Sequence, residues 1–115
     1  MSINEFTADR IRRALSSEAD VHEKRMFGGL AFMVNGKMCV VVSGRKSREG
    51  LIMVRVGPHS YADALHRTGA TPTIMKGKPV KGYVDVDESG QRDLKGWLKL
   101  ALAFNRTLVM DESAG

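Results

Sequence analysis

The sequence predicts an α+β domain of two layers, in which a mostly antiparallel sheet is packed by helices on one face. Two observations favour this class. Short apolar segments are joined by turn residues, as in hairpin-linked strands, and segments with helical periodicity frame them. The expected element order is α-β-β-β-α-β-β-α. The 115 residues show no internal repeat and no linker, so a single domain over 1–115 is expected.

An Asn-Gly pair marks the hairpin around which the sheet is predicted to form. Asn35-Gly36 separates two apolar runs, and both residues tolerate the positive φ angles of a type I′ turn. A two-residue loop predicts the pairs Val34 with Lys37, Met33 with Met38, Phe32 with Cys39 and Leu30 with Val41.

Further strands are expected at 21–26, 51–56, 74–76 and 80–86. The first of them is polar on at least one face, as edge strands often are. Gly28-Gly29 then interrupts the strand pattern. Two glycines inside such a pattern predict a bulge, or a place where another backbone comes close.

Three segments have the periodicity of helices. A capping box precedes apolar residues at helical spacing over about 3–16. A second, short helix is expected to begin near Ser60 and to end before Gly69. A long amphipathic helix is expected from about Leu94, and its Trp97 is predicted to anchor it against the sheet.

The predicted hairpin is apolar on both faces, which the pattern of a half-buried sheet does not require. The face assigned to the core carries Leu30, Phe32, Val34, Cys39 and Val41, together with Ile52, Val54 and Val56. The opposite face carries Ala31, Met33, Met38, Val40, Val42 and Met53. Helices on one side leave this second face uncovered. Met33, Met38 and Met53 are therefore the candidate surface for a protein partner or for self-association. The alternative is that these methionines are apolar residues scattered over the surface without a binding role.

The chain is basic, with 18 Lys and Arg against 13 Asp and Glu, and a formal net charge of +5. Such a balance favours a polyanionic partner such as nucleic acid. The candidates for phosphate contacts are Arg10, Arg12, Arg13, Arg45, Lys46, Arg48, Lys76, Lys78 and Lys81. These residues are dispersed along the sequence, so solvated basic faces on an ordinary soluble protein are the competing interpretation.

The sequence contains no pattern of catalytic or metal-ligating residues. The three histidines have no metal-ligand spacing, and Cys39 lies within an apolar strand, where a small buried side chain is expected. No catalytic residue, cofactor or metal is therefore predicted. A single cysteine fits a reducing compartment, and no apolar run has the roughly 20 residues of a membrane helix. A cytoplasmic protein without a membrane partner is expected.

A family resemblance adds to this interpretation. Residues 25–32 (Arg-Met-Phe-Gly-Gly-Leu-Ala-Phe) and 35–38 (Asn-Gly-Lys-Met) resemble the N-terminal domain of the TfoX/Sxy regulators of natural competence. Similar stretches follow at 51–56 and 77–80, and the similarity spans about 21–108. The full regulators have a second, C-terminal helical domain, so this chain is expected to be a stand-alone first domain.

The resemblance implies a two-layer α+β fold and a role in the transcription of competence genes, together with the cyclic-AMP receptor protein. It carries no catalytic residues over to this chain. The sequence therefore predicts a non-enzymatic regulatory or protein-interaction domain, with the transcription machinery as one possible partner. The alternative is a small basic domain that binds nucleic acid through largely sequence-independent phosphate contacts.

Overall fold

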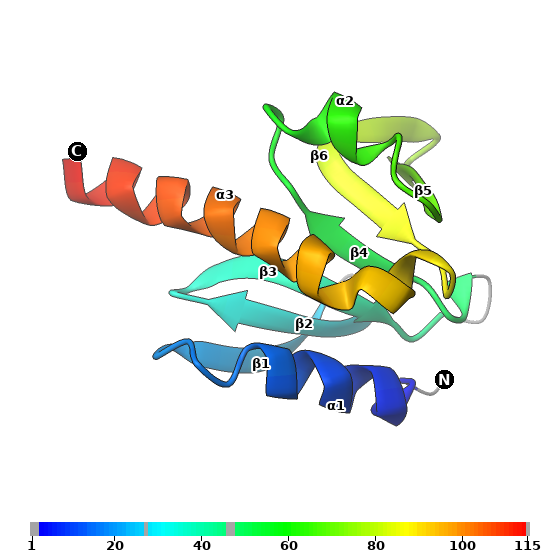
Figure 1. The fold of residues 1–115 in the computed structure, drawn as a ribbon, viewed down its shortest axis with the longest axis horizontal. Coiled ribbons are helices and arrows are strands. Elements are labelled where there is room, and N and C mark those ends of the chain that lie inside the picture. The colour runs from blue at the N-terminus through cyan, green and yellow to red at the C-terminus, as the bar shows by residue number, and fades with distance from the viewer. Residues whose placement is uncertain (1–2, 27, 46–47, 115) are drawn as a thin grey trace.

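The structure, a computed structural model, describes residues 3–26, 28–45 and 48–114, without the side chains of 111–114. In these residues six strands form one antiparallel sheet in the order β1-β2-β3-β4-β6-β5 (Figure 1). The strands are β1 (Val21–Met26), β2 (Gly29–Val34), β3 (Lys37–Ser43), β4 (Ile52–Arg55), β5 (Ala70–Met75) and β6 (Lys78–Val86). The helices are α1 (Glu5–Ala14), α2 (Tyr61–Ala64) and α3 (Leu94–Ala114), which the 3-10 turn η2 (Gly90–Asp93) precedes.

The predicted α+β class is confirmed, and the order α-β-β-β-β-α-β-β-α has one strand more than the expected order, because the segments before and after the two glycines are separate strands. The chain reverses direction next to Gly28, whose φ of 70° suits glycine, so that Met26 pairs with Gly29. The segments on either side of Gly28 are thus two antiparallel strands, and the expectation of a bulge at the two glycines is wrong. The alternative of a close backbone is confirmed, because a Cβ on Gly29 would collide with the carbonyl oxygen of Val42.

The Asn-Gly hairpin forms as predicted, but its register changes after two pairs. Asn35 and Gly36 have φ angles of 54° and 77°, as a type I′ turn requires. The pairs Val34–Lys37 and Met33–Met38 are confirmed. The predicted pairs Phe32–Cys39 and Leu30–Val41 are wrong, since Phe32 pairs with Val40 and Leu30 with Val42.

A β-bulge explains the shift, because Cys39 is an extra residue on β3 opposite the step from Phe32 to Met33. Cys39 and Val40 consequently both belong to the core under the helices, and alternation resumes one residue later. Three face assignments are corrected by this. Val40 and Val42 belong to the helix-side core, whereas Val41 lies on the opposite face.

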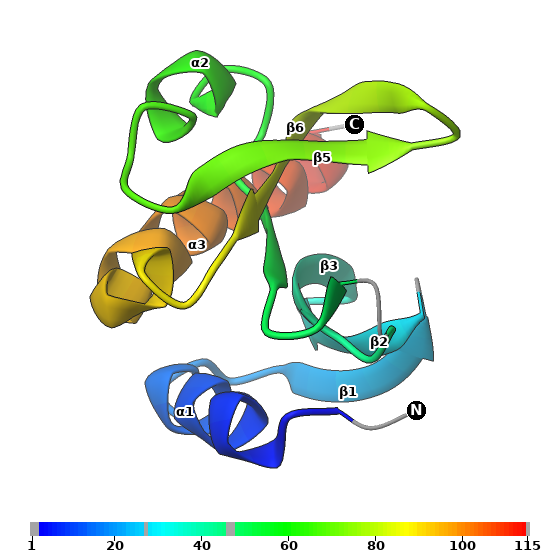
Figure 2. The same cartoon turned by 90° about the vertical axis from the view of Figure 1, so that its right-hand side faces the viewer.

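The three helices pack on one face of the sheet (Figures 1 and 2). Trp97 of α3 and Ile11 of α1 are fully buried with Phe32, Val54 and other strand residues, which confirms the predicted anchoring role of Trp97. The face that the helices leave free is called the outer face below.

A polar contact fixes α3 to the end of the central hairpin. The buried Asn105 donates from Nδ2 to the carbonyl oxygen of Val34 over 2.8 Å, and its Oδ1 accepts from Asn35 over 3.2 Å. These bonds satisfy an amide that would otherwise be costly to bury. The long helix is thereby held in register with the β2–β3 turn.

The two edges of the sheet differ in how they are built. β1 exposes the charged side chains of Glu23, Lys24 and Arg25. β5 contains the exposed Pro72 and a register shift between Pro72 and Ile74. Neither edge is a regular, uninterrupted apolar strand.

We expect the close approach at Gly29 to make this position intolerant of any side chain. Gly29→Ala should lower the free energy of unfolding by about 2 kcal/mol or more, because a backbone carbonyl cannot move out of the way of the new methyl group. Gly96→Ala is a matched control, since the three atoms nearest to its Cβ would all belong to the exposed carboxylate group of Asp93, which can rotate away. The control should be neutral or stabilising by up to about 1 kcal/mol. Urea denaturation measures both, and equal effects would contradict the explanation.

Candidate functional site

The outer face holds a second apolar cluster, separate from the core under the helices. Its buried members are Ala31, Met38, Val41 and Met53, and the partly buried Met26, Met33, Met75 and Tyr83 pack around them. The three methionines predicted as a partner surface do lie together here. Their exposure differs from the expectation, however, because Met38 and Met53 are only 7% and 5% exposed. Both are shielded by the chain itself, and Met33 is half-buried.

A row of cross-strand neighbours runs over this face. Ala31 pairs with Val41, Val41 with Met53, and Met53 with Asp85, so all four side chains point to the same side of the sheet. The sheet is strongly twisted, and the β5–β6 hairpin brings Met75 against the cluster (Figure 2). The apolar floor is therefore bordered by the hairpin on one side.

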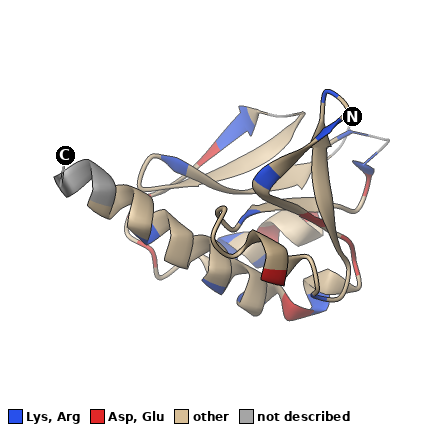
Figure 3. Cartoon of the chain, turned by 90° about the horizontal axis from the view of Figure 1, so that it is seen from above, with Lys and Arg blue, Asp and Glu red and all other residues tan. Residues whose placement is uncertain are grey.

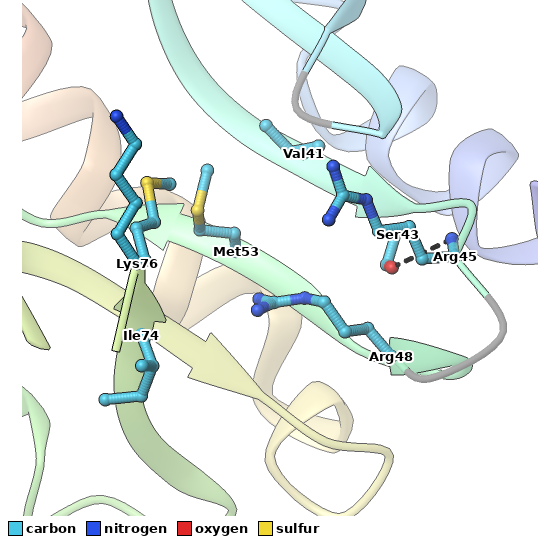
Figure 4. A pocket seen from close by; sticks show the side chains of 8 residues that line it. Val41, Ser43, Arg45, Arg48, Met53, Ile74 and Lys76 are labelled. Atoms are coloured by element: carbon cyan, nitrogen blue, oxygen red, sulfur yellow. Dashed lines mark hydrogen bonds between the residues drawn. The ribbon is translucent and has the colours of Figure 1, made fainter. Parts of the chain in front are cut away.

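A cavity of about 280 Å³ opens on the outer face between β3, β4 and the end of β5 (Figure 4). We call it the outer groove. Its apolar lining comes from Val41, Met53, Ile74 and Met75, and its polar lining from Ser43, Arg45, Arg48 and Lys76. Of the candidate methionines, Met53 forms part of the groove floor.

A buried carboxylate holds one of the basic side chains in place. Arg48 donates from Nη2 to Asp85 Oδ1 over 2.6 Å, and the hydroxyl of Thr73 donates to the same oxygen over 2.8 Å. Asp85 is only 6% exposed and Thr73 is fully buried, so this pair is poorly accessible to water. The contact fixes the guanidinium of Arg48 at the wall of the outer groove.

The other two cations reach the groove from turns. The side chain of Arg45 lies over Gly28, where any Cβ would collide with it, so the absence of a side chain at Gly28 makes room for this arginine. Lys76 has a φ of 51° and forms, with Gly77, the turn between β5 and β6. Within the described part of the chain, neither Arg45 nor Lys76 forms an ion pair.

The structure divides the predicted nucleic-acid residues among separate regions (Figure 3). Arg45, Arg48 and Lys76 line the outer groove, whereas Lys78 and Lys81 are exposed on β6. Arg10, Arg12 and Arg13 are on α1, in the helical layer behind the sheet. Lys46 lies outside the described residues.

Arg12 is largely engaged within the molecule. It donates to both oxygens of Glu23 over 2.6 and 2.8 Å and to Asp9 over 2.6 Å. The hydrogen bonds with Arg12 lower the pKa of Glu23 below its usual range. This arginine ties α1 to β1 rather than offering an unpaired charge.

A second basic region, which we call the helix cleft, lies between α1 and the start of α3. Arg10, Arg13, Arg92 and Lys95 line this shallow depression of about 480 Å³. Arg10 donates from Nη2 to the carbonyl oxygen of Gln91 over 3.0 Å, which joins its two sides. Sequence reasoning missed Arg92 and Lys95, because roughly 80 residues separate them from α1 and only the fold brings them together.

The remaining candidate residues do not form a catalytic or metal site. Cys39 is 1% exposed, as expected for a small buried side chain, and burial raises its pKa to about 12. Within the described residues, no three His, Cys, Asp or Glu side chains are arranged to hold a metal ion. No helix in the described part of the chain combines the length and apolarity needed to cross a membrane.

We predict that Asp85 stabilises the fold through its two donors. Asp85→Ala leaves the partly buried Arg48 and the buried Thr73 without their acceptor, so the free energy of unfolding should fall by about 2–3 kcal/mol. The exposed Glu49 provides the control, and Glu49→Ala should change stability by less than about 0.5 kcal/mol. Urea melts of both variants test this, and an Asp85→Ala protein as stable as the control would show that the pair contributes little.

Comparison with known proteins places the chain in a family. No curated protein and no solved structure gave a significant match. A family model, described as the TfoX N-terminal domain, matches residues 13–105. This range includes the two-glycine reversal, the Asn-Gly hairpin and most of α3. The chain therefore belongs to the TfoX N-terminal domain family.

Proposed function

We propose that this domain is a non-enzymatic regulatory module that binds another protein through the outer face of its sheet. One observation carries the proposal. The three helices pack on the opposite face, and on the outer face an apolar, methionine-rich cluster opens into a groove with three basic residues in its lining. Apolar surface bordered by charge is typical of a surface that recognises a protein.

Family membership supports the regulatory part of the proposal. The TfoX regulators that the sequence resembles act on the transcription of competence genes, so a component of the transcription machinery is the partner class to test first. The cyclic-AMP receptor protein is the specific candidate that the resemblance supplies. Action in the cytoplasm is consistent with this role.

The methionines suit such a surface for a physical reason. Methionine side chains are flexible and polarisable, so Met33 and Met75 at the border of the cluster can adapt to a partner. Met38 and Met53 lie beneath them and serve as a fixed floor. The exposed Ile74, at 47%, is the apolar side chain of the groove most available for contact.

We predict that Ile74→Asp abolishes association with the partner while leaving the fold intact. The exposed side chain loses little burial on substitution, but a carboxylate would have to be desolvated in the interface. Phe6→Asp is the matched control, because Phe6 is 74% exposed and lies on α1, away from the outer face. Binding to purified cyclic-AMP receptor protein is measured by isothermal titration calorimetry, and self-association by sedimentation velocity.

The same variants also identify partners other than the cyclic-AMP receptor protein. Columns carrying the original chain, Ile74→Asp and Phe6→Asp are compared for proteins that they retain from an extract of the source cells. A partner lost only with Ile74→Asp supports the outer face as the interface. If Ile74→Asp associates as the original chain does, the proposed surface is wrong.

Nucleic-acid binding remains a second candidate because of the helix cleft. Four basic side chains from two distant parts of the chain meet there, and Asp93 is the one acidic residue that lines the described cleft. Cations grouped in this way are the usual basis of phosphate contacts. The cleft is on the helical layer, so it does not compete for the outer face.

If the helix cleft binds nucleic acid, affinity for a random duplex must fall steeply with salt. Each neutralised phosphate contributes about −0.9 to the slope of log K against log salt concentration. The double variant Arg13→Glu/Lys95→Glu should weaken binding and reduce the size of this slope by about 2. Arg45→Glu/Lys76→Glu changes the net charge equally and is the control. Fluorescence anisotropy that detects no binding at about 50 mM salt would exclude this function.

A further inference from the structure

The size of the outer groove limits what can occupy it. Its volume of about 280 Å³ lies just below the usual range of small-ligand pockets, roughly 300–1,000 Å³. A helix or a folded loop is too large to be enclosed by such a space. One apolar side chain together with a small polar group fits, so the groove suits a single terminal residue of a chain better than an extended interface.

The polar part of the groove is built to meet a negative charge. The side chains of Arg45 and Arg48 both extend from the β3–β4 connection toward Met53 (Figure 4). Arg48 uses Nη2 for Asp85, and a guanidinium carries five N–H donors, so donors remain for a ligand. Ser43, whose Oγ accepts from the backbone N–H of Arg45, still has its hydroxyl proton to donate.

The charge balance of the groove is positive. Among the described residues, its lining contains three cations and no acidic residue, and the adjacent Asp85 compensates for Arg48 alone. The charges of Arg45 and Lys76 are therefore available. A ligand group with one negative charge would relieve the repulsion among the cations, and two arginines can bind a carboxylate with charge-assisted hydrogen bonds.

The apolar floor and the arginines share one small space, so the ligand must combine an apolar group and an anion at short range. In an extended peptide, neighbouring side chains point to opposite faces, and an internal Asp or Glu therefore points away from the apolar side chain beside it. A C-terminal apolar residue carries its side chain and its carboxylate on the same Cα. This is the peptide group that satisfies both halves of the groove.

We propose that the outer groove binds the C-terminal residue of a partner protein, with the apolar side chain on Met53 and Ile74 and the terminal carboxylate between Arg45 and Arg48. This deepens the proposed function and rests on it, because it names the part of the partner that the outer face recognises. Lys76 strengthens the attraction from the opposite wall.

The test uses a fluorescein-labelled hexapeptide that ends in leucine with a free carboxylate, and fluorescence anisotropy with the full chain. We expect the free acid to bind at least tenfold more tightly than the same peptide with a C-terminal amide. A peptide that ends in lysine should also bind at least tenfold more weakly, because a second cation would enter the groove.

Variants identify the groove as the site. Arg45→Gln should weaken binding of the free acid about tenfold and remove most of the difference between acid and amide. Arg106→Gln is the control, since Arg106 is an exposed arginine on α3, in the helical layer, and its loss should leave both affinities unchanged. Circular dichroism melts verify that each variant is folded. Equal binding of acid and amide, no binding of either, or no effect of Arg45→Gln would each overturn the proposal.

A competition experiment separates a chain terminus from a small free carboxylate. N-acetyl-leucine, which mimics a terminal residue, should displace the labelled peptide, whereas hexanoate should do so at least tenfold less well. Equal displacement by both would assign the groove to a small amphipathic acid and overturn the commitment to a peptide terminus.

The inference and the proposed function fail in different ways. If Ile74→Asp abolishes association with the partner but acid and amide peptides bind alike, the outer face is an interface and the terminal-carboxylate inference is wrong. If Ile74→Asp leaves the association intact, the interface itself is elsewhere.

Discussion

One extra residue in β3 determines how the apolar side chains of the central hairpin are divided between the two faces of the sheet. Cys39 is bulged, so Val40 and Val42 pack under the helices and Val41 turns to the outer face. Without the bulge, Val41 would sit in the core and two other valines would face outward. The floor of the outer groove thus depends on a bulged residue two positions before Val41 on the same strand.

Much of the fold followed from local signals in the sequence. Asn35-Gly36 identified the central turn, and the spacing of apolar residues identified the helix anchored by Trp97. The bulge at Cys39 gave no such signal, because the strand is apolar at every position from Met38 to Val42 and any register buries apolar side chains. Alternation predicts a register only where one face of the strand is polar.

The candidate site was harder to predict, because it depends on which distant segments become neighbours. The three methionines were correctly grouped on one face, but their burial depends on side chains from the edges of the sheet. Arg48 meets Asp85 because β4 pairs with β6 across the intervening α2 and β5, and no property of either segment specifies that pairing. Likewise, the sequence indicated only a backbone role for Gly28. In the structure this glycine also makes room for the side chain of Arg45.

The edges of the sheet have a consequence for how copies of this protein meet in concentrated solution. Pro72 has no N–H to offer along β5, and the register shift beside it breaks the ladder that an incoming strand would extend. At the other edge, charges on β1 oppose stacking of strand on strand. Growth of the sheet into fibrils is therefore discouraged at both ends, and a chain with an apolar outer face can stay dispersed.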